Sequence, residues 1–325
     1  MTQAAAAPAR EALAAHGAET IAKGSKSFAM ASLLFGRDMQ ADVQMLYAWC
    51  RYCDDVIDGQ DLGQDAPDAD LSADEQARRL DVLKADTHRA MRGEFVGHPA
   101  FDGFSIVARK HKMPERYAMD LLDGFAMDVA RAPFVAMNDT MQYCYGVAGA
   151  VGIMMAIVMG VDPEDEATLD RACDLGLAFQ LTNICRDVID DARGGRIYLP
   201  AELLAAHHLK PETASILSPV NRVAVFNAAS HLLDCADQYY NSASQGVRML
   251  PPRAAAAVAA ARNVYRDIGR LVRERGPDAW VDRPYTSTAR KAWLAAGGVL
   301  TGAPQSFVLK ASGAAPRGDL WRRPL

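Results

Sequence analysis

Apolar residues recur along most of the chain at the spacing of one helix face, and no segment shows the alternation typical of a half-buried strand. Breaks rich in glycine, proline and aspartate separate the periodic segments. The pattern predicts helices at residues 10–35, 38–58, 76–92, 101–111, 115–131, 139–160, 165–192, 200–206, 220–247 and 252–275. We therefore expect an all-α protein.

Two stretches lack this periodicity. Residues 59–73 are acidic and rich in glycine and proline, which predicts a loop that is either a lid or simply solvated surface. Residues 301–325 are expected to form a weakly ordered tail. We expect the rest of the chain, residues 1–300, to form a single domain.

Two predicted helices end in aspartate clusters. Asp54 and Asp58 lie at the end of one, Asp187 and Asp191 at the end of another, and glycine follows each cluster. Carboxylates four residues apart share a helix face and repel one another, at a helix end that is already negative. One such end is often solvated surface, but two of them favour a site for divalent cations.

Polar residues continue each acidic stripe toward the middle of its helix. Tyr47 and Arg51 precede the first cluster, and Gln180 and Asn183 precede the second. Oxygen ligands suit a hard cation, and Mg²⁺ is typical where phosphate oxygens complete the octahedron. Because both clusters would have to meet around the same ions, we expect one domain in which they grip a diphosphate.

Further candidate residues lie near these clusters. Ser25, Lys26 and Ser27 supply two hydroxyls and an ammonium that suit a diphosphate. Arg186 and Arg196 lie beside the second cluster, either as salt-bridge partners or as phosphate contacts, since arginine binds phosphate bidentately.

Residues 141–161 are apolar and rich in methionine, glycine and alanine. Such a run is usually a core helix, but its small residues could also leave room for a long apolar chain. Tyr143 and Tyr145, at its start, could present a ring face or a hydroxyl near the ions.

Charge and composition narrow the function class. The net charge of −5 leaves no basic footprint for nucleic acid. The six cysteines form no convincing metal or redox pattern and fit a reducing cytoplasm. The N-terminus lacks a secretion pattern, and the apolar run 147–161 is shorter than the ~20 residues of a bilayer span. We expect a cytoplasmic protein.

Several segments together carry a family resemblance. They are SKSF, YAWCRYCDDVID, YCYGVAGAVG, LGLAFQLTNICRDVIDDARGGRIYLP and VYR at residues 264–266. In this combination and order they resemble the head-to-head prenyl synthases of the squalene and phytoene synthase family. The similarity spans roughly residues 15–281.

The resemblance implies an isoprenoid-synthase-type helical bundle around a central hydrophobic cavity. It implies condensation of two geranylgeranyl diphosphates, through a cyclopropylcarbinyl diphosphate, to a C40 triene. Mg²⁺, for which Mn²⁺ can substitute, would be held by Asp54, Asp58, Asn183, Asp187 and Asp191. Those four aspartates and Tyr143 would act in catalysis. The substrate-binding residues would be Ser25, Lys26, Ser27, Tyr47, Arg51, Gln180, Asn183, Arg186, Arg196 and Tyr265.

Alternatives remain at this point. The same chemistry on farnesyl diphosphate would give dehydrosqualene, or squalene if NADPH is used; we expect no NADPH. A non-catalytic relative, a terpene cyclase and a head-to-tail elongase fit the motifs less well. A product too apolar for water implies peripheral association with a membrane.

Overall fold

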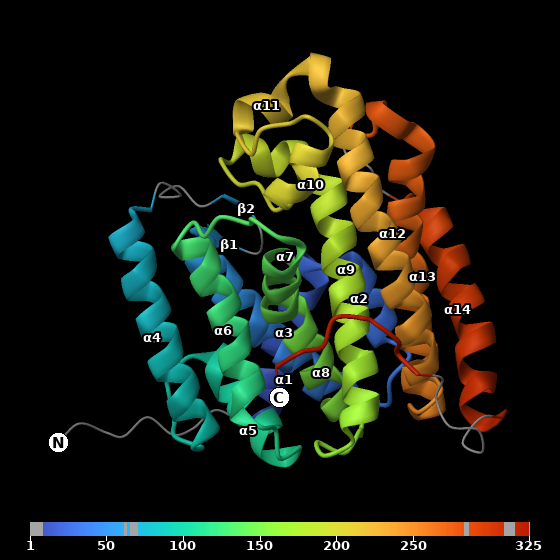
Figure 1. Cartoon of the computed structure of the whole chain (residues 1–325). Helices are drawn as coiled ribbons and strands as arrows, with labels where there is room; N and C mark the ends of the chain where they lie inside the picture. The colour runs from blue at the N-terminus through green and yellow to red at the C-terminus, as the bar shows by residue number, and fades with distance from the viewer. Residues whose placement is uncertain (1–8, 62–63, 66–70, 283–285, 309–315, 325) are drawn as a thin grey trace.

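The computed structural model describes residues 9–61, 64–65, 71–282, 286–308 and 316–324. Within them the regular structure is helical, as Figure 1 shows, apart from a two-residue antiparallel pair. Strands β1 (Gln60–Asp61) and β2 (Gln64–Asp65) form this pair directly after the first aspartate cluster. The all-α prediction is confirmed. Residues 62–63 and 66–70 of the expected acidic loop lie outside the described residues.

The helices follow one another with short connections. The first half of the chain forms α1 (Arg10–Gly24), α2 (Lys26–Ser32), α3 (Arg37–Asp58), α4 (Ala73–Met91), α5 (Pro99–Lys110) and α6 (Glu115–Val129). The second half forms α7 (Met137–Cys144), the π-helical turn η1 (Tyr145–Gly149), α8 (Ala150–Val158), α9 (Glu166–Arg193), α10 (Ala201–Ala206), α11 (Thr213–Leu217), the 3₁₀ turn η2 (Pro219–Asn221), α12 (Arg222–Val247), α13 (Pro252–Arg275), the 3₁₀ turn η3 (Gly276–Asp278) and α14 (Thr288–Val308).

The predicted helix over 10–35 is interrupted at Ser25. This residue is extended, and its hydroxyl accepts a hydrogen bond from the Phe28 N–H at 3.3 Å, which caps α2. The helix α14 was missed. Its glycines allow α14 to pack closely on α13, and they give no apolar periodicity in the sequence. A Cβ at Gly298 would lie 2.4 Å from the Ala260 nitrogen.

The expected C-terminal tail, residues 301–325, includes the end of α14 and a segment that packs on α9. Helix α14 extends past residue 300 and ends at Val308. Residues 316–324 are held against α9 by ion pairs of Arg317 and Arg323. The sequence could not show this, because the carboxylates that hold these arginines lie far away along the chain. Residues 309–315 and 325 lie outside the described part.

Helix α9 runs through the middle of the bundle and contacts α8, η1, α12 and α13 (Figure 1). The approach is close: a Cβ at Gly176 would lie 2.2 Å from the Ala148 carbonyl oxygen. The apolar segment Met137–Val158 is long and apolar enough to cross a membrane, but 67% of its most apolar stretch is buried inside the fold. It is therefore a core element that forms one wall of the cavity described below.

Candidate active site

The C-terminal ends of α3 and α9 border one cavity of about 760 Å³. Most of the predicted site residues line it: Ser25, Tyr47, Arg51, Asp54, Asp58, Tyr143, Gln180, Asn183, Arg186, Asp187, Asp191, Arg196 and Tyr265. Lys26 and Ser27 are not among the lining residues, and Lys26 is exposed to solvent. The two acidic stripes therefore meet, as their spacing predicted.

The first cluster closes α3, which ends at Gly59 in a left-handed conformation with φ of 67°. Arg51 pairs with Asp54 at 3.1 Å and with Asp55 at 2.8 Å. Burial, reinforced by the neighbouring carboxylates of Asp58 and Asp55, raises the pKa of Asp54 to about 7 although Arg51 opposes the shift. This end of the cavity holds more negative charge than one arginine neutralises.

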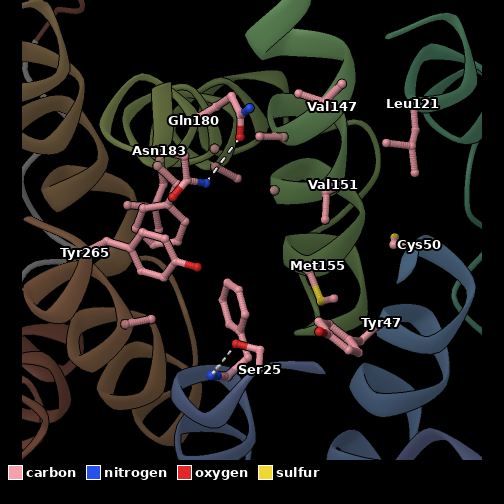
Figure 2. A pocket seen from close by; sticks show the side chains of 18 of the residues that line it. Ser25, Tyr47, Cys50, Leu121, Val147, Val151, Met155, Gln180, Asn183 and Tyr265 are labelled. Atoms are coloured by element: carbon pink, nitrogen blue, oxygen red, sulfur yellow. Dashed lines mark hydrogen bonds between the residues drawn. The ribbon is translucent and has the colours of Figure 1, made fainter. Parts of the chain in front are cut away.

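The second cluster repeats the arrangement on α9. Arg186 Nε donates to Asp187 Oδ1 at 2.9 Å, and burial and Asp187 raise the pKa of Asp191 to about 7. Asn183 donates from Nδ2 to Gln180 Oε1 at 3.3 Å (Figure 2). Its Oδ1 atom is buried and has no hydrogen-bond partner in the structure. A buried acceptor without a hydrogen-bond partner at this place fits a role as a cation ligand.

The donor set fits Mg²⁺. In the described parts of the chain, no group of three or more His, Cys, Asp or Glu side chains could hold a metal ion by itself. Mg²⁺ does not require such a group, because it commonly keeps several waters and binds one or two carboxylates together with substrate phosphates. The oxygen ligands and the orphaned Asn183 Oδ1 are consistent with ions shared between protein and diphosphate.

Asp128, at the end of α6, is a residue that the sequence reasoning missed. It accepts hydrogen bonds from Tyr198 at 2.7 Å and from Tyr143 at 3.0 Å, and lies 3.4 Å from Arg196. Arg196 also reaches Asp58 at 3.1 Å. Burial raises the pKa of Asp128 and, more strongly, that of Tyr143, so the tyrosine remains a hydrogen-bond donor. A lone aspartate in a helical pattern gave no signal.

The candidate arginines can now be placed. Arg51, Arg186 and Arg196 each contact an aspartate of the site, so the salt-bridge alternative describes the structure as it stands. All three also line the cavity, where a diphosphate would find their remaining donors.

Beyond the carboxylates the cavity becomes apolar and aromatic. Figure 2 shows Tyr265 on one side and Val151 and Met155 on the other. The Tyr265 ring stacks on Phe179 with centroids 4.2 Å apart, and Phe28 lies 5.7 Å from it. The cavity thus joins a charged end to a long apolar wall.

Comparison with known proteins agrees with this geometry. Residues 21–291 match the family described as squalene/phytoene synthase, and the chain belongs to that family. A 15-cis-phytoene synthase of Pantoea ananas is 48% identical over 311 residues, which cover 95% of this chain and 97% of that protein. A 15-cis-phytoene synthase of Paracoccus sp. is 46% identical over 313 residues, covering 94% and 96%.

The fold is found among solved structures as well. A crystal structure of a dehydrosqualene synthase in complex with ligand aligns with a TM-score of 0.77 at 26% identity, covering 89% of this chain and 96% of that one. The helical-bundle fold and the family resemblance drawn from the motifs are both confirmed.

Proposed function

We propose that the protein is a 15-cis-phytoene synthase of carotenoid biosynthesis. It joins two geranylgeranyl diphosphates head to head, through a cyclopropylcarbinyl diphosphate, to phytoene and releases diphosphate. The observation that carries the proposal is the meeting of two acidic helix ends at one end of a long apolar cavity. The 48% identity to a bacterial 15-cis-phytoene synthase, which extends over 95% of this chain, supports the same substrate.

The charged end would bind the diphosphates. Asp54 and Asp58 on α3, with Asn183, Asp187 and Asp191 on α9, would hold Mg²⁺, for which Mn²⁺ can substitute. The ions would neutralise the diphosphate and stabilise it as a leaving group when the allylic C–O bond ionises. Arg51, Arg186 and Arg196 would add hydrogen bonds to the phosphate oxygens.

The apolar walls would protect the carbocations. Val147, Val151 and Met155 exclude water, which would otherwise capture an allylic cation. The rings of Phe179 and Tyr265 line the same space and can stabilise positive charge at short range. Tyr143, held by Asp128, lies near the carboxylates with its proton retained.

A product assay tests the proposal. The purified protein is incubated with geranylgeranyl or farnesyl diphosphate and Mg²⁺, with and without NADPH, and the organic-soluble product is identified. We expect a C40 triene without NADPH. A C30 product would replace phytoene synthase by dehydrosqualene or squalene synthase, and no hydrocarbon from either substrate would overturn the enzymatic proposal.

The metal is tested in the same assay. Chelation with excess EDTA should abolish turnover, and added Mg²⁺ or Mn²⁺ should restore it. Turnover that survives chelation would contradict the role given to the aspartates.

Peripheral membrane association in the cytoplasm is part of the proposal, because the product is too apolar for water. Exposed apolar side chains on α14 support it: Trp293 is 72% and Leu300 75% exposed. Co-flotation with anionic vesicles is the expected result, and complete recovery of active enzyme in the lipid-free fraction would contradict it.

A further inference from the structure

Residues 316–324 form a segment that we name the C-terminal strap. It crosses the N-terminal half of α9, as the red trace in Figure 1 shows. Arg317 binds both carboxylate oxygens of Asp174, at 3.0 and 2.6 Å, and reaches Asp170 at 3.1 Å. Arg323 donates to Asp170 at 2.7 Å and also contacts Glu166.

The Arg317–Asp174 pair is buried, and the Arg323 side chain is buried as well. The Asp174 side chain is 0% exposed, that of Arg317 13% and that of Arg323 1%. A bidentate guanidinium–carboxylate pair fixes direction as well as distance, and removing one partner leaves an uncompensated buried charge. The strap is therefore anchored at one defined position on α9.

The anchor connects to the cavity wall. Asp174 also accepts a hydrogen bond from the hydroxyl of Ser242 on α12, and that hydroxyl accepts one from Arg171 Nη1. Arg171 lines the cavity. Its stem is packed tightly against α12, where a Cβ at Gly246 would lie 2.4 Å from the Arg171 Cβ. Arg317, Asp174, Ser242 and Arg171 thus form one chain of contacts from the strap to the cavity.

Arg171 is one of the cavity-lining residues near the N-terminal end of α9, far along the helix from the aspartate cluster. Along α9 it precedes Asp187 by about 24 Å, at the helical rise of 1.5 Å per residue. A prenyl chain whose diphosphate binds at Asp187 extends toward Arg171, and only a sufficiently long chain contacts this far wall. A hydrophobic pocket gains binding energy for each methylene group that it contacts, so the position of this wall affects which chain length binds better.

We propose that the C-terminal strap fixes the far wall of the chain cavity through Arg317, Asp174 and Arg171, and that this wall sets the preference for the longer prenyl chain. The inference rests on the proposed function. Arg317 touches no substrate and acts as a positioning residue.

The test measures binding rather than turnover. Dissociation constants for the geranylgeranyl and farnesyl S-thiolodiphosphates, which resist ionisation, are measured by calorimetry with Mg²⁺. Arg317→Ala should weaken the C20 analogue about tenfold more than the C15 analogue, since C15 does not reach the far wall. The matched control Arg322→Ala removes an exposed arginine of the same strap and should leave the ratio of the two constants unchanged.

A general structural role for the strap would weaken both analogues equally. An unchanged ratio in folded Arg317→Ala therefore overturns the proposal. If that variant does not fold, Arg317→Lys keeps the charge but loses the bidentate geometry, and a smaller shift of the ratio in the same direction is expected; an unchanged ratio in this variant overturns the proposal as well. Failure of the wild-type protein to form a C40 hydrocarbon would overturn the proposed function, while the two binding constants could still be compared.

Discussion

Single side chains decide what the charged end of the cavity can bind. Asp54 and Asp191 belong to different helices, and burial raises the pKa of each to about 7. Each carboxylate is thus partly withdrawn from solvent and lies beside other carboxylates. A bound cation would favour the charged form, which explains why such groups can lie together in an otherwise apolar fold.

We expect Asp54→Asn and Asp187→Asn each to reduce turnover by at least about 100-fold, because each removes charge that stabilises the leaving group. The thermal midpoint should stay close to that of the wild type, because neither side chain is part of the apolar core. Steady-state kinetics and a thermal melt check both points. Asp190→Asn is the control, since Asp190 is 51% exposed and pairs with Arg193; a variant of Asp54 or Asp187 that keeps more than about a tenth of wild-type activity would contradict the metal assignment.

Asp128 gives a second prediction at this scale. The substitution Asp128→Asn would remove the negative charge opposite Arg196. It would also remove one of the two carboxylate oxygens that accept hydrogen bonds from Tyr143 and Tyr198. Turnover should fall about tenfold to 100-fold, the effect of losing a hydrogen bond to a charged group. The control is Asp123→Asn on the same helix, whose side chain is 64% exposed. Equal activity of the two variants would show that Asp128 has no part in the site.

At the scale of elements, one buried carboxylate ties three helices together. Asp42 of α3 is 0% exposed and is bound by Arg10 of α1 at 2.7 Å, and by Lys110 and His111 at the end of α5 at 2.6 and 2.8 Å. Burial alone would raise the pKa of Asp42, but these hydrogen bonds outweigh it and lower the pKa to about 2. The pairing holds α1 and α5 against the helix that carries the first aspartate cluster.

We expect Asp42→Asn to lower the free energy of unfolding at pH 7 by about 2 kcal/mol, because the buried carboxylate loses the charged hydrogen bonds that Arg10 and Lys110 donate to it. Since the folded-state pKa is below the ordinary 3.8, this stabilisation is complete above about pH 4 and is lost as the pH falls toward 2. Urea unfolding of both proteins at pH 7 and pH 3 measures the difference, which should be smaller at pH 3. The exposed Asp81→Asn on α4 should show no such difference at either pH.

At the scale of the whole molecule, the cavity depends on the complete fold. Its walls come from segments as far apart as Ile21 and Tyr265, so the site exists only when α1, α3, α9 and α13 are packed together. Ligands that need this site bind the folded state alone and must stabilise it as a whole.

We therefore expect the geranylgeranyl S-thiolodiphosphate and Mg²⁺ together to raise the thermal midpoint more than the sum of their separate effects, because the ions are shared with the diphosphate. At 100 times its dissociation constant the ligand should add about 2.7 kcal/mol to the unfolding free energy. Differential scanning calorimetry with each component alone and with both measures this. Strictly additive shifts would contradict shared ions.

Much of the site was predictable because its signals are local. The spacing of Asp54 with Asp58 and of Asp187 with Asp191 places each pair on one helix face, which depends only on near neighbours. Lys26 was expected beside the diphosphate because it lies between two serines, yet the capped turn at Ser25 leaves it exposed. Successive residues of a helix face different directions, so Ser25 lines the cavity and Lys26 does not.

The sequence by itself thus determined the helical class and the two acidic helix ends, since apolar period and i,i+4 spacing are properties of neighbouring residues. Only the tertiary structure decided that Asp128 joins the site, that Arg171 lines the cavity, and that the C-terminal strap is anchored on α9. Those contacts join residues far apart in the chain. Their partners are chosen by packing and by the burial of charge, which leave no periodic signal along the sequence.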